Sequence, residues 1–132
     1  MNVPTNIGGV VVNALAGILS VLLAVLFAYV GCAKLIGVPG MVQEFAEIGI
    51  GQWLRYFVGI LEVSGAIGVL IPKFRFWASL QLATVMAGAT VTNLAVLHLP
   101  VVARLTAILM GLALALSWLR RPYSVRSEMA RV

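Results

Sequence analysis

Four polar side chains interrupt or border the apolar segments of this 132-residue chain, and their types are suited to chemistry: Lys34, Glu62, Asn93 and Arg104. Glu62 comes nine residues after Trp53, which at about 1.5 Å per helical residue is ~13 Å into its segment. A carboxylate near the middle of a bilayer costs on the order of 2.5 to 3.5 kcal/mol, so it must face other helices and either find a partner or keep its proton. We therefore predict a polar site around Glu62.

The same depth arithmetic puts Lys34, Asn93 and Arg104 near the corresponding ends of their own segments. Because Lys and Arg side chains reach inward from an interface, either cation is expected to pair with Glu62, and Asn93 is expected to bridge them. A pocket of this kind suits a proton-coupled reaction, the head of a quinone or another lipid, or a small solute. The alternative interpretation is that the network only fixes the order and rotation of the helices. The predicted rim of the pocket consists of Trp53, Arg55 and Tyr56.

Patterns typical of self-contained catalysis are missing from the sequence. The chain has one histidine, His98, and one cysteine, Cys32, so it offers no cluster at the spacing of a metal, haem or disulfide site. We interpret His98 as a turn residue and expect Gln81 to make a hydrogen bond between helices. No catalytic residue and no metal ligand are predicted, and a quinone is the one cofactor considered.

The composition indicates that most of the surface of this protein faces lipid and not water. Hydrophobic residues make up 62% of the chain and charged residues 10%, against roughly 45 to 50% and about 25% in soluble domains. The net charge of +5 comes from cations at the ends of apolar runs, which is typical of membrane topology and not of a nucleic-acid surface. The lipid bilayer is therefore a predicted partner, and nucleic acid is excluded.

Long apolar runs separated by short breaks predict an all-α fold, an integral membrane bundle of four up-and-down helices. The first run follows no cation and exceeds the apolar region of a signal peptide, so we expect it to stay in the protein. Pro72 with Lys73 ends the second run, and Pro100 opens the fourth directly after the third, which makes the last two helices antiparallel neighbours. The predicted helices cover residues 10–33, 53–71, 76–97 and 100–119.

The segment between the first two helices predicts a short amphipathic helix at residues 39–48, lying on the membrane interface. Pro39 suits a first helical turn, and Gly49 suits a helix end. Apolar and polar side chains fall on different faces of this segment. These are Met41, Val42, Phe45 and Ile48 on one face and Gln43, Glu44 and Glu47 on the other.

The distribution of cations predicts the orientation in the membrane. Six of the nine Lys and Arg lie on the side of the two termini, and the side richer in these residues faces the cytoplasm. We expect a membrane domain over residues 1–119 and a basic cytoplasmic tail over residues 120–132, with both termini cytoplasmic. The six cations are Lys73, Arg75, Arg120, Arg121, Arg126 and Arg131.

Small residues recur at every fourth position of the first and fourth predicted helices, and such stripes let membrane helices pack closely. We expect these faces to meet inside the bundle or at a contact in a homo-oligomer. The stripes are Ala16, Ser20, Ala24, Ala28 and Cys32 on the first helix and Ala103, Ala107, Gly111 and Ala115 on the fourth.

Three stretches of the sequence, 27–34, 38–56 and 59–66, together with the pair Ile71-Pro72, resemble the DoxX-like family of small four-helix membrane proteins. Many relatives carry a histidine near the end of the third helix, where this chain has Asn93. A role tied to that histidine therefore does not carry over. The residues that carry the resemblance are Gly31, Lys34, Gly49, Gln52, Trp53, Arg55, Tyr56, Gly59 and Glu62.

The resemblance implies a multi-pass protein of the bacterial inner membrane, with relatives linked to a thiosulfate:quinone oxidoreductase and to membrane redox complexes. It implies a redox-associated subunit that binds quinone or a similar amphiphile and is not catalytic alone. Such a subunit works with a membrane redox partner protein that carries the electron-transfer centre of a quinone-dependent oxidoreductase. The alternatives are a non-catalytic scaffold or assembly factor for a partner membrane protein and a small-solute transporter.

Overall fold

The computed structural model describes residues 6–121 and 123–131, and those residues contain helices and turns but no strand. The prediction of an all-α fold is therefore confirmed. Residues 1–5 of the predicted membrane domain and residues 122 and 132 of the predicted tail lie outside the described residues. The helices are α1 (Ile7–Ile36), α2 (Pro39–Ile48), α3 (Gln52–Leu70), α4 (Arg75–Ala95), α5 (Pro100–Leu119) and α6 (Tyr123–Ala130).

Local capping explains why α1 is longer than the predicted segment 10–33. The Asn6 side chain accepts a hydrogen bond from the backbone N–H of Gly9 at 3.4 Å, which stabilises a helix start three residues earlier. At the other end Gly37 has a φ of 81° and donates its N–H to the Ala33 carbonyl. This left-handed conformation favours glycine and ends the helix.

A ten-residue helix, α2, occupies the loop at Pro39–Ile48, the residues predicted for it. Proline at its first turn and Gly49 at its end, with a φ of 81°, set its limits. The burial of its side chains follows the amphipathic pattern, because Phe45 is buried while Gln43 and Glu47 are exposed. The helix therefore presents its acidic face away from its apolar contact.

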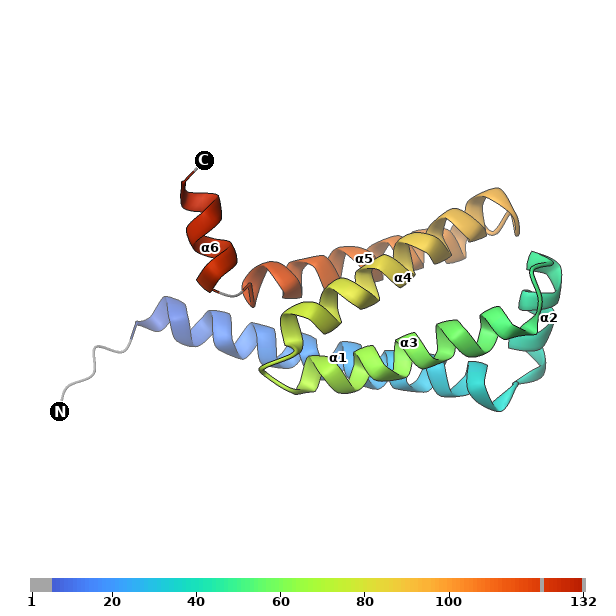
Figure 1. Cartoon of the computed structure of the whole chain (residues 1–132), viewed down its shortest axis with the longest axis horizontal. Helices are drawn as coiled ribbons and strands as arrows, with labels where there is room; N and C mark the ends of the chain where they lie inside the picture. Colours follow the sequence, from blue (N-terminus) through green and yellow to red (C-terminus); the bar gives the residue numbers. More distant parts are fainter. Residues whose placement is uncertain (1–5, 122, 132) are drawn as a thin grey trace.

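The four long helices, α1, α3, α4 and α5, run along the molecule in alternating directions, as Figure 1 shows. The two described ends of the chain lie at one end of the molecule, and α2 lies at the other with the turn between α4 and α5 (Figure 1). His98 lies in that turn with a φ of 55° and is exposed, so its interpretation as a turn residue is confirmed. The prediction that α4 and α5 are antiparallel neighbours is also confirmed, since they pack along their length.

The core is built by two helix pairs, α1 with α3 and α4 with α5, which meet mainly through α3 and α4. Contact between α1 and α5 is sparse. Gln81 of α4 donates hydrogen bonds to the Leu61 carbonyl at 2.8 Å and to Ser64 Oγ at 2.9 Å on α3, which confirms its predicted role between helices. The buried residues of this apolar core cluster are Ala16, Leu23, Ala24, Phe27, Ala66, Val69, Ala78, Leu82, Ala83, Met86, Ala113 and Leu116.

The two small-residue stripes behave differently. On α1, Ala16, Ser20 and Ala24 are buried as predicted. On α5 the stripe turns outward after Ala103, and Gly111 is exposed, with no atom within 4 Å of the position that a Cβ would take. Of the two expected places for these stripes, the inside of the bundle therefore does not hold for most of the α5 stripe, because the larger Leu116 takes the position facing the core, and the contact in a homo-oligomer stays a prediction.

Among the described residues, three helices are long and apolar enough to cross a membrane: α1, α3 and α5. The fourth long helix, α4, has 21 residues, about 31 Å at 1.5 Å per residue, but it is less apolar because it carries glutamine, asparagine and three threonines. The chain is therefore an all-α membrane protein. Its last helix, α6, lies in the basic tail, for which the sequence pattern predicts no helix.

Candidate functional site

The site begins at a close crossing of α1 and α3, where Gly31 faces Gly59. A Cβ on Gly31 would lie 3.0 Å from the Gly59 carbonyl oxygen and 2.8 Å from Val63 Cγ2, so a larger residue there would push the helices apart. Small residues at such a crossing allow two membrane helices to approach closely. The crossing brings the next turn of α1 against the next turn of α3.

Lys34 and Glu62 form an ion pair just beside this crossing. Lys34 Nζ lies 2.8 Å from Glu62 Oε2 and 3.1 Å from Oε1, so the ammonium donates to both carboxylate oxygens. The two residues are 8% and 1% exposed, respectively. Charged hydrogen bonds of this kind are among the stronger ones, and burial makes each charge dependent on the other. The pair therefore joins α1 to α3 and leaves Glu62 with a satisfied charge.

Arg55 is buried beneath the pair, so its predicted place on the rim of a pocket is wrong. Its Nη1 donates to the backbone carbonyl of Lys34, and its Nε donates to Gln52 Oε1 at 2.7 Å. The Lys34 carbonyl belongs to the last turn of α1, where carbonyls lack partners within the helix. Spacing could have revealed this role, since Arg55, Gly59 and Glu62 share one face of α3 at steps of four and three.

The other two predicted rim residues, Trp53 and Tyr56, are 61% and 48% exposed. Trp53 Nε1 donates to the Ile50 carbonyl at 3.1 Å, and the Tyr56 ring lies 4.3 Å from the Arg55 guanidinium carbon. Both rings stand on the outer surface of α3. Neither lines the cleft described below.

Arg104 does not join the ion pair. It is exposed on α5, and within the described residues it makes no hydrogen bond or ion pair. The reason is the rotation of α5, because the buried position in this turn belongs to Ala103, one residue or about 100° around the helix from Arg104. The expectation that either cation would serve Glu62 is therefore settled in favour of Lys34.

Asn93 is buried near the end of α4, but it does not bridge Lys34 and Glu62. It is 3% exposed. Its Nδ2 donates to the Ala89 carbonyl of the preceding turn at 2.8 Å, while its Oδ1 has no hydrogen-bond partner among the described residues. Buried polar atoms in folded proteins nearly always have a partner. Oδ1 is therefore a buried acceptor that is free to take a hydrogen bond from a ligand.

Asn93 lines a cleft of about 240 Å³ between the polar face of α2 and the corner where α4 meets α5. The cleft thus lies between two segments that are far apart in the sequence, α2 on one side and the α4–α5 corner on the other. The Gln43 amide donates to Glu47 Oε1 at 3.3 Å across this face of α2. The lining residues are Gly40, Gln43, Glu44, Glu47, Asn93, Leu97, Leu99 and Val102.

Glu44 and Glu47 are functional candidates that the amphipathic pattern identifies only as part of the polar face of α2. A signal for them exists in the sequence, since two carboxylates one turn apart sit on a helix beside a membrane. In the part of the chain that the structure describes, no three His, Cys, Asp or Glu side chains gather as a metal-binding group.

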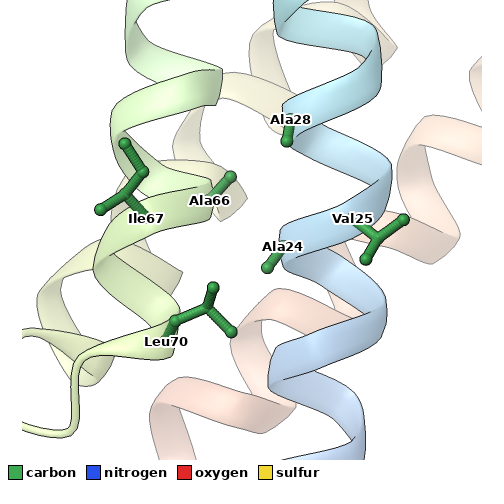
Figure 2. A pocket seen from close by; sticks show the side chains of 6 residues that line it. All are labelled: Ala24, Val25, Ala28, Ala66, Ile67 and Leu70. Carbon is green, nitrogen blue, oxygen red and sulfur yellow. The ribbon is translucent and has the colours of Figure 1, made fainter.

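A second hollow, of about 210 Å³, lies between α1 and α3 nearer the terminal end of the molecule. Figure 2 shows Ala24 and Ala28 of α1 and Ala66 of α3 along the space between the two helices. All six lining side chains are aliphatic, the others being Val25, Ile67 and Leu70. Such a surface offers no hydrogen bond to a polar group and suits an acyl chain of the surrounding lipid.

Comparison with models of known protein families gives a match. No curated protein and no solved structure matches this chain. The model of the DoxX-like family matches residues 18–119, which run from the middle of α1 to the end of α5 and include Lys34, Glu62 and the cleft. The match covers more than half of the chain and reaches all of its long helices. The chain therefore belongs to the DoxX-like family.

Proposed function

We propose that this protein is a membrane subunit that binds the head of a quinone-type amphiphile in the cleft between α2 and the α4–α5 corner. The observation that carries the proposal is the unpartnered Oδ1 of Asn93, a buried acceptor at a cleft. Leaving such an atom without a hydrogen bond costs about 1 to 3 kcal/mol. A ligand that donates to this atom would recover that free energy.

The Lys34–Glu62 pair has a positioning role in this proposal and does not bind the head itself. The two charges are paired with each other and both side chains are buried, so we assign the pair to the packing of the helices. The pair holds α1 against α3, and α2 is the short connection between those two helices. The pair therefore positions the two helices that α2 connects.

The proposal includes an arrangement in the membrane. We place α1, α3, α4 and α5 across the bacterial inner membrane as a four-helix bundle, with α2 on the outer interface and both termini in the cytoplasm. The start of α1, the helix α6 and the basic end of α5 lie on the side opposite α2 (Figure 1), in agreement with the excess of Lys and Arg there. The cleft then opens at the level of the lipid heads.

The redox role rests on the family and on the ligand class. A subunit that binds a quinone-type head without a redox centre of its own would deliver or receive this carrier beside a partner membrane protein that holds the centre. The described chain offers such a subunit a head-sized cleft and an aliphatic groove between α1 and α3 that suits lipid chains. We therefore assign the chemistry of electron transfer to the partner.

Photolabelling in nanodiscs tests the proposal. Wild-type protein is irradiated with a photoreactive quinone analogue, and labelled peptides are identified by mass spectrometry. We expect label on α2 and on residues 93–102, and we expect Asn93→Leu to lose it. Thr84→Val is the matched control, because Thr84 is an exposed residue of the same helix that bonds only its own helix. Label spread evenly over all lipid-facing helices in a folded wild-type protein would refute the proposal.

A scaffold role is the second candidate, and one observation favours it. Gly88 on α4 and Gly111 on α5 are exposed, with open space where a Cβ would stand. Flat small-residue surfaces of this kind let another membrane helix approach. In this case Gly111→Leu would abolish assembly with a partner membrane protein while leaving quinone labelling unchanged, as measured by native mass spectrometry of the complex.

A further inference from the structure

Acceptors outnumber donors among the polar side chains of the cleft. Asn93 Oδ1 has no partner among the described residues, and the carboxylates of Glu44 and Glu47 accept hydrogen bonds only. Each of the two amide nitrogens of the cleft already donates one of its two N–H groups inside the protein, Asn93 Nδ2 to the Ala89 carbonyl and Gln43 Nε2 to Glu47 Oε1. In the described parts of the chain, no Lys, Arg or His lines the cleft. A bound head therefore meets more acceptors than donors, together with negative charge.

The orientation of the Asn93 amide follows from its surroundings. Nδ2 lies 2.8 Å from the Ala89 carbonyl oxygen. Rotating the amide by half a turn would put Oδ1 against that oxygen, so two acceptors would face each other without a proton between them. The amide is thus held with its nitrogen toward α4, and its oxygen is the atom left for a ligand.

We propose that the cleft selects heads that donate hydrogen bonds, so that it binds the hydroquinone form of a quinone-type amphiphile in preference to the quinone form. This inference rests on the proposed function and names the redox state of its ligand. A hydroquinone carries two hydroxyl donors, one for Asn93 Oδ1 and one for a carboxylate of α2. A quinone carries two carbonyl oxygens, which accept only and would be placed beside acceptors.

The apolar half of the cleft favours a ring over other donor heads. Leu97, Leu99 and Val102 form the wall opposite the acidic face of α2. A flat ring buries its faces on such aliphatic side chains, while its hydroxyl groups reach the polar wall. An alkylammonium head shares the donor chemistry and would be attracted by Glu44 and Glu47, but it has no surface to pack against this wall.

Binding measurements on the full chain in nanodiscs test the inference. The probes are a short-chain hydroquinone kept anaerobic, the matching quinone, the dimethyl ether of the hydroquinone, and dodecylammonium. We expect the hydroquinone to bind about tenfold more tightly than the quinone and the ether, which lack its donors. Asn93→Leu should remove most of this preference, and Glu44→Gln should reduce it. Glu128→Gln, an exposed carboxylate on α6, is the matched control.

The outcomes separate the inference from the proposed function. If the quinone binds as tightly as the hydroquinone, the donor selection is refuted while quinone-type binding stands. If only dodecylammonium binds, donor selection stands and the quinone-type function is refuted. If no probe binds to folded wild-type protein, both are refuted. Circular dichroism and gel filtration of each variant establish that it is folded.

Discussion

Lys34 of α1 and Glu62 of α3 meet through two hydrogen bonds of 2.8 and 3.1 Å, although 28 residues separate them along the chain. Their meeting depends on the glycine crossing one turn away, where Gly31 lies against Gly59. A buried ion pair of this kind specifies which helix faces touch. It therefore fixes how α1 and α3 are rotated against each other, and with them the position of α2.

Removing one member of the pair should destabilise the protein strongly. Lys34→Met leaves the Glu62 carboxylate buried without its cation, and such a change costs about 3 to 5 kcal/mol. Replacing both residues by methionine should recover most of this loss. The measurement is reversible unfolding in mixed micelles, analysed as a double-mutant cycle. Additive effects of the two single changes would contradict the coupling, and the exposed Arg131–Glu128 pair at 3.9 Å serves as a control expected to contribute little.

Enlarging the glycine at the crossing should separate α1 from α3. Gly31→Leu forces a side chain into the space next to Val63 and the Gly59 carbonyl, and overpacking of this kind costs about 1 to 3 kcal/mol. Gly17→Leu on the same helix is the control, because nothing lies within 4 Å of a Cβ there. Thermal unfolding in detergent compares the two. Equal stability of both variants would show that the crossing is looser than described.

Substitution by methionine should change backbone hydrogen exchange at Arg55 but not at Arg104. Arg55→Met removes donors from the Lys34 carbonyl and from Gln52, so backbone amides at the end of α1 should exchange with deuterium faster. Arg104→Met removes an exposed guanidinium and should leave exchange unchanged throughout. Hydrogen exchange followed by mass spectrometry distinguishes the two. Faster exchange near Glu62 in the Arg104 variant would restore the arginine to the site.

Asn93→Leu should separate stability from binding. In the absence of ligand it replaces a buried acceptor without a partner by an apolar side chain of similar size, so stability should stay the same or rise by about 1 kcal/mol. The variant should at the same time lose ligand binding. Chemical unfolding of ligand-free protein makes the test. A clear loss of stability would indicate that the bond from Nδ2 to the Ala89 carbonyl has a structural role instead.

Cysteine labelling tests the orientation. In a Cys32→Ser background, Gly40→Cys places a thiol on α2, and Arg131→Cys places one at the opposite end, both at exposed positions. An impermeant maleimide should label the first in intact cells and the second only after permeabilisation. The reverse pattern would place α2 and its cleft on the cytoplasmic side.

Much of the fold was predictable because its signals are local. Proline and glycine set the limits of α2, since both act on their own backbone, and long apolar runs mark spans in any arrangement of helices. Glu62 stood out for a similar reason, because a carboxylate within an apolar run needs a partner wherever the helix packs. The pairing with a cation from a helix end followed from depth alone.

Only the tertiary structure decided how the helices are rotated. Periodicity identifies the faces of one helix but not the neighbour that each face meets, so it could not choose between Lys34 and Arg104, or turn Arg55 inward. The cleft was hidden for the same reason. It lies between the acidic face of α2 and Asn93 at the corner of α4 and α5, two segments about fifty residues apart, and no local pattern in the chain records that they border one space.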